Sequence, residues 1–168
     1  MAEAEINAIP NPLINIMLQG RHDTYPKRRG MTRVRELMAA GINVAFGHDC
    51  VMDPWYSMGS GDMLEVGHMA IHVAQMSGVE DKKKIFEALT VNSAKALGIE
   101  GYGLAVGCNA DLVVLQAEDV LEALRLKPAR LAVLRRGKVI ARTAPKVAEL
   151  SLPGRPVSLD TGRNPTAR

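Results

Sequence analysis

Ile42-Asn43-Val44-Ala45-Phe46-Gly47-His48-Asp49 is a short apolar run that ends abruptly in polar residues. Val44 and Phe46 favour β-strands, and a glycine stands at each end of the run. The sequence therefore predicts a buried strand over 42–46. Because α/β barrels keep their chemistry just past the carboxyl ends of their strands, this placement makes Asp49 the first candidate functional residue.

The residues before this strand predict a parallel arrangement. Pro12 followed by Leu13-Ile14-Asn15-Ile16 is typical of a short strand that starts after a turn. A polar loop follows, and Thr32 is a good N-cap for a helix over 33–40 that Gly41 would end. A strand, a helix and a second strand in this order indicate a βαβ unit.

The rest of the chain is predicted to change from helical to antiparallel. Asp62 suits the N-cap of a helix over 63–76, and a second helical segment extends over 81–97 with a break near 90–93. Further on we expect a strand over 110–115, a short helix over 119–126, and a hairpin of 131–134 with 139–141. We therefore divide the chain into residues 1–100, residues 101–150, and a loose C-terminal tail, 151–168.

Composition excludes several classes of function. Of the 168 residues, 47% are hydrophobic and 23% charged, which is typical of a globular protein. The net charge is only +3, the basic clusters are short and aromatic residues are few, so we expect no nucleic-acid partner. No apolar run approaches a membrane span of about 18 residues. Two cysteines without a CxxC pair indicate a reducing, cytoplasmic setting.

The polar residues after the strand allow more than one interpretation. Asp49 could bind a divalent metal or act as a general base, whereas a bare His-Asp pair is also common in polar loops and helix caps. Trp55 offers a flat side chain suited to covering a planar ligand. Cys50 is either a pocket-lining thiol or, with His48 two residues away, a nucleophile; the thiol interpretation is the better one.

Several motifs together carry a resemblance to a known family. They are Pro12-Leu13-Ile14-Asn15-Ile16, Leu18-Gln19-Gly20-Arg21, Asp23-Thr24-Tyr25-Pro26-Lys27-Arg28-Arg29-Gly30, Gly47-His48-Asp49 and Asp53-Pro54-Trp55-Tyr56. They resemble the C-terminal part of the bacterial cytosine deaminase branch of the amidohydrolase superfamily. Gly103-Leu104-Ala105-Val106-Gly107 with Ala110-Asp111-Leu112-Val113-Val114-Leu115 resembles the superfamily's return strand into its small β-domain.

The resemblance implies an α/β fold, namely a C-terminal fragment of a (β/α)8 metal-dependent hydrolase barrel plus part of the flanking small β-domain. It implies that Asp49 ligates one divalent metal (zinc, iron or manganese) and shuttles a proton from the attacking water. It also implies that Trp55, Cys50 and His48 bind the substrate, with Cys50 standing where the cytosine-specific branch has a second aspartate.

This chain departs from the family pattern in its metal ligands. No His-x-His pair is present, the family's glutamate acid is unmatched, and Met17 stands where relatives carry a histidine. His68 and His72 share helical spacing, but we interpret them as structural or solvent-facing. The chain alone is therefore expected to be inactive and to bind metal weakly.

Three functional hypotheses remain. The first is hydrolytic deamination of cytosine or a related cyclic amidine by the complete protein, a homo-oligomer that acts on a pyrimidine-like small molecule. The second is a non-catalytic fragment or pseudoenzyme subunit that associates with a complementing chain, since two βα units cannot close a barrel. The third is a small ligand-binding α/β domain.

Overall fold

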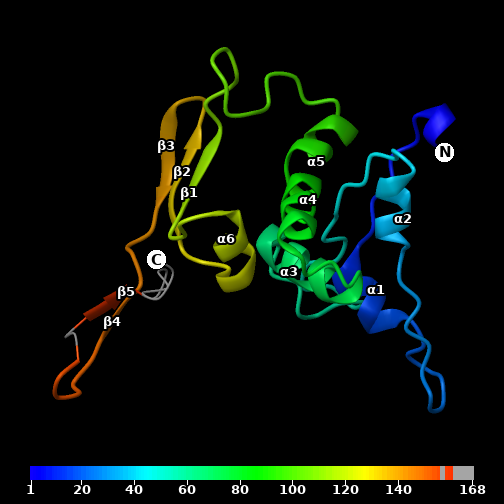
Figure 1. Cartoon of the computed structure of the whole chain (residues 1–168), viewed down its shortest axis with the longest axis horizontal. Coiled ribbons are helices and arrows are strands. Elements are labelled where there is room, and N and C mark those ends of the chain that lie inside the picture. The colour runs from blue at the N-terminus through cyan, green and yellow to red at the C-terminus, as the bar shows by residue number, and fades with distance from the viewer. Residues whose placement is uncertain (156–157, 161–168) are drawn as a thin grey trace. The chain divides into compact units, whose positions relative to one another are not determined.

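The computed structural model describes residues 1–155 and 158–160. The chain divides into two compact units, Met1–Glu100 and Gly101–Arg168. The helices of the first unit, shown in Figure 1, are η1 (Ala2–Ala4), α1 (Pro12–Leu18), α2 (Val34–Ala39), α3 (Met63–Val73), α4 (Val79–Leu89) and α5 (Val91–Ala96). The elements of the second unit are β1 (Leu112–Leu115), α6 (Val120–Leu126), β2 (Arg130–Arg135), β3 (Lys138–Arg142), β4 (Val147–Glu149) and β5 (Ser158–Asp160).

A pair of parallel extended segments lies at the centre of the first unit. Ala8 and Val44 form a parallel bridge. The Ala8 N–H donates to the Asn43 carbonyl at 2.9 Å, and the Ala45 N–H donates to the Ala8 carbonyl at 3.0 Å. The predicted strand over 42–46 is thus an extended, buried segment, although its regular pairing is limited to this short stretch.

The strand predicted after Pro12 is wrong, because these residues form helix α1. Proline suits the first turn of a helix, where its missing N–H has no helical partner and its fixed φ is already helical. Pro12, Leu13 and Ile14 are buried, and α1 packs on α3. This burial stabilises a helix of seven residues that is too short to form alone. The parallel partner of Val44 is instead the segment around Ala8.

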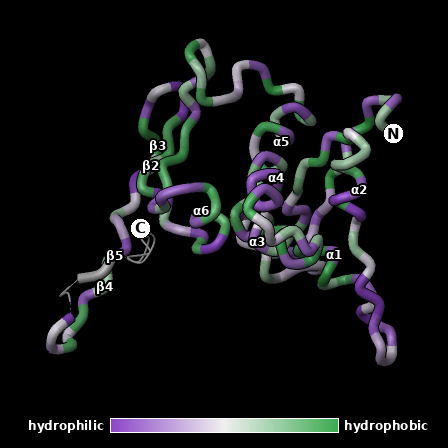
Figure 2. Tube along the Cα trace, in the orientation of Figure 1, coloured by the Kyte–Doolittle hydropathy of each residue, from purple (hydrophilic) through white to green (hydrophobic). Residues whose placement is uncertain are grey.

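Helix α2 ends as predicted but does not begin as predicted. The N-cap residue is Arg33, with no side-chain capping bond, and Thr32 only contributes its carbonyl to the Val34 N–H at 2.8 Å. The Thr32 cap is therefore wrong. Gly41 follows the helix with φ 75°, a left-handed conformation that glycine adopts without steric cost. The loop between α1 and α2 is mostly hydrophilic in Figure 2.

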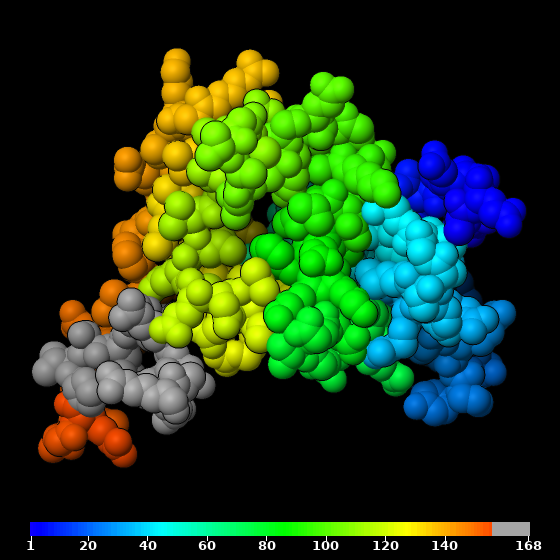
Figure 3. All heavy atoms as spheres, turned by 45° about the horizontal axis from the view of Figure 1, so that its top comes forward, coloured from blue at the N-terminus to red at the C-terminus, as the bar shows by residue number. Residues whose placement is uncertain are grey.

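Helices α3, α4 and α5 complete the core of the first unit. The Asp62 carboxylate accepts a 2.8 Å hydrogen bond from the Leu64 N–H, which confirms it as the cap of α3. The predicted break in the second helical segment falls at Thr90, between α4 and α5. Arg35 of α2 pairs with Asp81 of α4 at 3.1 Å, and Figure 3 shows these two segments side by side. The described hydrophobic residues of the first unit that have no solvent exposure are Val44, Val66, Ala70, Ile85 and Ala88.

The second unit is antiparallel, with strand order β1-β2-β3. Asp119 caps α6 by accepting a 2.8 Å hydrogen bond from the Glu122 N–H. The β2–β3 hairpin turns at Arg136-Gly137, where both φ angles are positive (49° and 76°), as a type I′ turn requires. No helix within residues 1–155 and 158–160 has the length and apolar character needed to cross a membrane.

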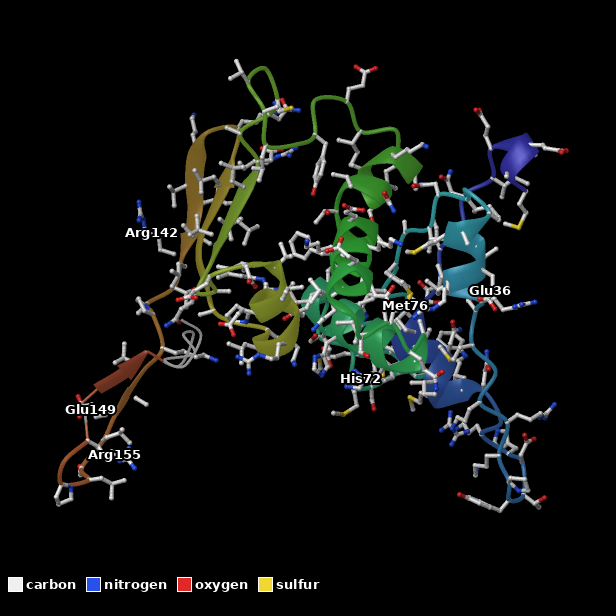
Figure 4. The ribbon with its side chains drawn as sticks, in the orientation of Figure 1. Glu36, His72, Met76, Arg142, Glu149 and Arg155 are labelled. Atoms are coloured by element: carbon white, nitrogen blue, oxygen red, sulfur yellow. The ribbon has the colours of Figure 1, made fainter. Side chains whose placement is uncertain are left out.

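The C-terminal region contains more order than predicted. Strand β5 (Ser158–Asp160) pairs antiparallel with β4, so the loose tail predicted over 151–168 is wrong for this part. Backbone pairing of a short hairpin has no strong hydrophobic signature in the sequence. Glu149 on β4 and Arg155 in the connection are labelled in Figure 4. Residues 156–157 and 161–168 of the predicted tail lie outside the described residues.

Candidate functional site

Asp49 lies just past the carboxyl end of the parallel pair. The pairing ends where the Gly47 N–H donates to the Pro10 carbonyl at 3.1 Å. Two residues later Asp49 adopts φ 66°, a left-handed conformation that aspartate tolerates better than most residues. Its side chain is exposed, and one carboxylate oxygen accepts a 3.2 Å hydrogen bond from the Asn11 side-chain amide. The carboxylate is thus oriented from the neighbouring segment.

Asn11 is a residue of the candidate site that sequence reasoning missed. It occupies the N-cap position of α1 but makes no side-chain capping bond there, which leaves its amide for Asp49. Gly47 allows this approach, because a Cβ at position 47 would lie 2.2 Å from the Asn11 side-chain oxygen. The signal that was available is an asparagine before Pro12, a position where a polar side chain precedes an apolar run.

The Cys50 thiol is buried beside two carboxylates. Its Sγ donates to one Asp49 oxygen at 3.6 Å. Burial raises the pKa of Cys50 to about 12, and hydrogen bonds to Asp53 and Asp49 add to the effect. A thiol in this setting stays protonated and uncharged at neutral pH, so the structure does not favour a nucleophile at this position.

His48 is buried, and both of its ring nitrogens have partners in the protein. Nδ1 lies 2.8 Å from the Cys50 carbonyl, and Nε2 lies 3.1 Å from the Gly61 backbone nitrogen. A carbonyl can only accept and an N–H can only donate. His48 therefore carries its proton on Nδ1 and is neutral in this arrangement. The predicted contact of His48 with a substrate would need one of these two bonds to open.

Trp55 lies on a turn that Asp53 organises. One Asp53 oxygen accepts hydrogen bonds from the Trp55 and Tyr56 N–H groups, each at 3.0 Å. The bond from Tyr56, followed by the Cys50 thiol, lowers the pKa of Asp53. The Trp55 side chain is 62% exposed. The structure thus brings Asp49, Cys50 and Asn11 together, and among the described residues the Trp55 ring forms no hydrogen bond with any of the three.

The described residues do not fit a complete metal centre. Within residues 1–155 and 158–160, no three His, Cys, Asp or Glu side chains gather as a metal site requires. Asp49 offers one exposed carboxylate. His68 and His72 lie together on α3 with ring centroids 4.7 Å apart, and His72 (Figure 4) bonds the His68 carbonyl at 2.7 Å. This pair lacks a third ligand, which agrees with a structural role.

A buried extended segment that ends in an oriented carboxylate is the arrangement of a barrel hydrolase. The chain belongs to the amidohydrolase family, which residues 1–145 match.

Two curated relatives and one solved structure define its position within the family. The chain is 36% identical to the pterin deaminase of Rhizobium rhizogenes over 152 residues, covering 89% of this chain and 34% of that protein. It is 34% identical over 110 residues to the N-isopropylammelide isopropyl amidohydrolase of Pseudomonas sp., covering 65% and 27%. The 5-methylcytosine deaminase of Klebsiella pneumoniae, solved with 5-fluorocytosine, matches at TM-score 0.80 and 43% identity, covering 89% and 36%.

These similarities confirm the resemblance to cytosine deaminase-like amidohydrolases and the expected fold class, a mixed α/β part of a deaminase barrel. Deaminases of this family are generally metal-dependent. The chain spans about a third of the length of the curated relatives that it matches.

Proposed function

We propose that this chain is part of a metal-dependent amidohydrolase that deaminates cytosine or a related cyclic amidine by hydrolysis. The deaminase activities of two relatives support this proposal, since 5-methylcytosine and pterin are both planar rings that carry an exocyclic amino group. In such a reaction water adds to the ring carbon that bears the amino group, and ammonia leaves. We propose that the zinc, iron or manganese ion is held mainly by ligands outside this chain, because no three His, Cys, Asp or Glu side chains gather as a metal site within the described residues.

Asp49 is the residue that carries the proposal. Its carboxylate is exposed at the end of the parallel pair, and the Asn11 amide holds one of its oxygens. A carboxylate in this place can accept a proton from the attacking water and later return it to the leaving amino group. In the proposed enzyme Asp49 would also contribute one ligand to the metal. Asn11 would keep the carboxylate directed toward the reacting atoms.

We propose that Cys50, Trp55 and His48 shape the substrate pocket. An uncharged thiol is a weak hydrogen-bond partner, so Cys50 would suit a ring edge that is less polar than that of cytosine. Trp55 lies on an adjacent turn with most of its ring exposed, and is available to cover a planar ring. Rates of ammonia release from a panel of cyclic amidines that includes cytosine, 5-methylcytosine and pterin would show which ring the pocket prefers.

The test is reconstitution with the missing part of the barrel. We would co-express this chain with the part of the Klebsiella deaminase that it does not cover, and measure ammonia release. We expect no activity from this chain alone, activity from the complex, and loss of that activity in Asp49→Asn. Asp81→Asn, which changes a carboxylate paired with Arg35, is the matched control and should stay active.

The outcome also separates the second hypothesis from the first. A stable complex that releases no ammonia from any ring would favour a non-catalytic subunit that only associates with a complementing chain. Activity of the isolated chain, or full activity of Asp49→Asn, would contradict the proposed role of Asp49.

We further propose that the complete protein is a homo-oligomer that acts in the cytoplasm on a pyrimidine-like small molecule. Large apolar side chains that are exposed in the first unit, Ile9, Met52 and Met58 among them, support further association. Both cysteines are free, which fits a reducing compartment. Light scattering on the reconstituted protein would measure its oligomeric state.

A further inference from the structure

Residues 50–61, called here the site loop, connect the Asp49 end of the parallel pair to helix α3. The loop carries Asp53 and Trp55 and therefore borders the proposed site. Its two ends lie close together. A Cβ at Gly59 would lie only 2.2 Å from the Cys50 carbonyl oxygen, and Gly61 has φ +74°. The loop thus closes on itself at Gly59, where a side chain has no room, and at Gly61, whose left-handed backbone favours glycine.

His48 lies between the two ends of the site loop. Its Nδ1 donates to the Cys50 carbonyl at the start of the loop, and its Nε2 accepts from the Gly61 N–H at the end. The side chain is only 8% exposed, so water has little access to compete for either bond. A rigid ring fixes the separation of the donor and the acceptor. The two loop ends are therefore held at a set distance.

We propose that His48 is a positioning residue that fastens the site loop closed beside Asp49, and that it does so as the neutral tautomer with the proton on Nδ1. Its importance for the site rests on the proposed function, because the loop matters for catalysis only if Asp49 does. The fastening itself is independent of catalysis. Release of His48 would free the turn at Asp53 and with it Trp55, while the parallel pair behind Asp49 would remain.

Three substitutions separate the two bonds from simple packing. His48→Asn retains a donor near the Nδ1 position and loses the acceptor for Gly61. His48→Gln can place a carbonyl oxygen near the Nε2 position and loses the donor to Cys50. His48→Phe keeps a ring and loses both. His22→Phe, at an exposed position in the loop between α1 and α2, is the matched control.

The readouts are amide hydrogen exchange at Gly61 and fluorescence anisotropy of Trp55, which is the only tryptophan in the chain. We expect Gly61 to exchange about tenfold faster in His48→Asn and His48→Phe, as loss of one hydrogen bond predicts, and close to the wild-type rate in His48→Gln. Trp55 anisotropy should fall in His48→Phe. The His22→Phe control should match the wild type in both measurements.

Long-range proton–nitrogen NMR spectra of the four histidines test the tautomer directly. We expect the Nδ1–H pattern for His48 at neutral pH, and the Nε2–H pattern or a charged ring would overturn the proposal. Wild-type exchange at Gly61 in a folded His48→Phe, or equally fast exchange in all three variants, would also overturn it. If His48→Phe does not fold, the proposal is tested by the difference in Gly61 exchange rate between His48→Asn and His48→Gln. None of these readouts uses deaminase activity, so failure of the proposed function is distinguished from failure of this proposal.

Discussion

Gly47→Ala tests the close approach that orients Asp49. The added Cβ would lie 2.2 Å from the Asn11 side-chain oxygen, well inside van der Waals contact. If Asn11 swings away, its hydrogen bond to the exposed Asp49 carboxylate is lost, at about 0.5–1.5 kcal/mol. If Asn11 stays, overpacking costs about 1–3 kcal/mol. Alanine also lowers the conformational entropy of the unfolded chain relative to glycine. This effect favours the folded state and offsets about 0.4–1 kcal/mol of the loss. Because the protein takes the less costly of the two routes, we expect a net loss of at most about 1 kcal/mol in the free energy of unfolding.

A double-mutant cycle with Asn11→Ala identifies the cause. Removal of the Asn11 side chain removes both the clash and the hydrogen bond, so Gly47→Ala should cost little in that background. The expected coupling is about 1 kcal/mol. Urea unfolding followed by Trp55 fluorescence reports on the first unit. Gly30→Ala is the control, since it lies in the loop between α1 and α2 and its Cβ would meet only the Gln19 side-chain oxygen, at 3.3 Å.

Two results would refute this reasoning. Additive effects of Gly47→Ala and Asn11→Ala would show that the glycine is not needed for the approach of Asn11. An equal loss of stability in Gly30→Ala would attribute the effect to alanine in general and not to the contact at position 47.

Three further predictions follow from single contacts. Asp62→Ala removes the cap on the Leu64 N–H and should lower the free energy of unfolding by about 1 kcal/mol, measured by urea denaturation. The pKa of the Asp53 carboxyl is lowered in the folded state. The ionised carboxylate therefore contributes to the free energy of unfolding above the ordinary carboxyl pKa, and this contribution is lost as the pH falls through the pKa of Asp53 in the folded state. The urea midpoint should therefore fall less steeply below about pH 4 in Asp53→Asn than in the wild type, and identical slopes would disprove this. The Cys50 thiol is buried and its pKa is raised to about 12, so iodoacetamide at pH 8 should modify Cys108 and spare Cys50. Mass spectrometry of the labelled peptides measures this, and faster labelling of Cys50 than of Cys108 would contradict the prediction.

The sequence was sufficient to predict those elements whose structure depends on residues that are close together in the chain. The Asp62 cap, the left-handed residue at Gly41 and the Arg136-Gly137 hairpin are all formed by residues a few positions apart. Such elements depend on turn and cap chemistry that single residues display. The predicted carboxylate past the strand end also required only the pattern of one segment.

Tertiary contacts decided the rest. The β-branched residues of α1 favour a strand by propensity, but burial against α3 and the proline in the first turn favour the helix. The Asn11–Asp49 bond joins residues 38 apart, and the His48–Gly61 bond closes a loop of 13. No periodicity in the sequence encodes contacts of this kind. The sequence placed Asp49 past the end of the extended segment, whereas the contacts that support its side chain were not predicted.

Strand β3 has a consequence for the behaviour of this chain in concentrated solution. It lies at one edge of the three-stranded sheet, and all five of its residues are exposed, including Val139 and Ile140. An apolar edge of this kind can recruit the same strand of another molecule. Lys138 and Arg142 lie at the two ends of the strand. If a second copy paired with it in antiparallel register, Lys138 of each copy would lie opposite Arg142 of the other. Repulsion between these positively charged side chains opposes the pairing of two β3 strands, which would be the first step of fibril growth.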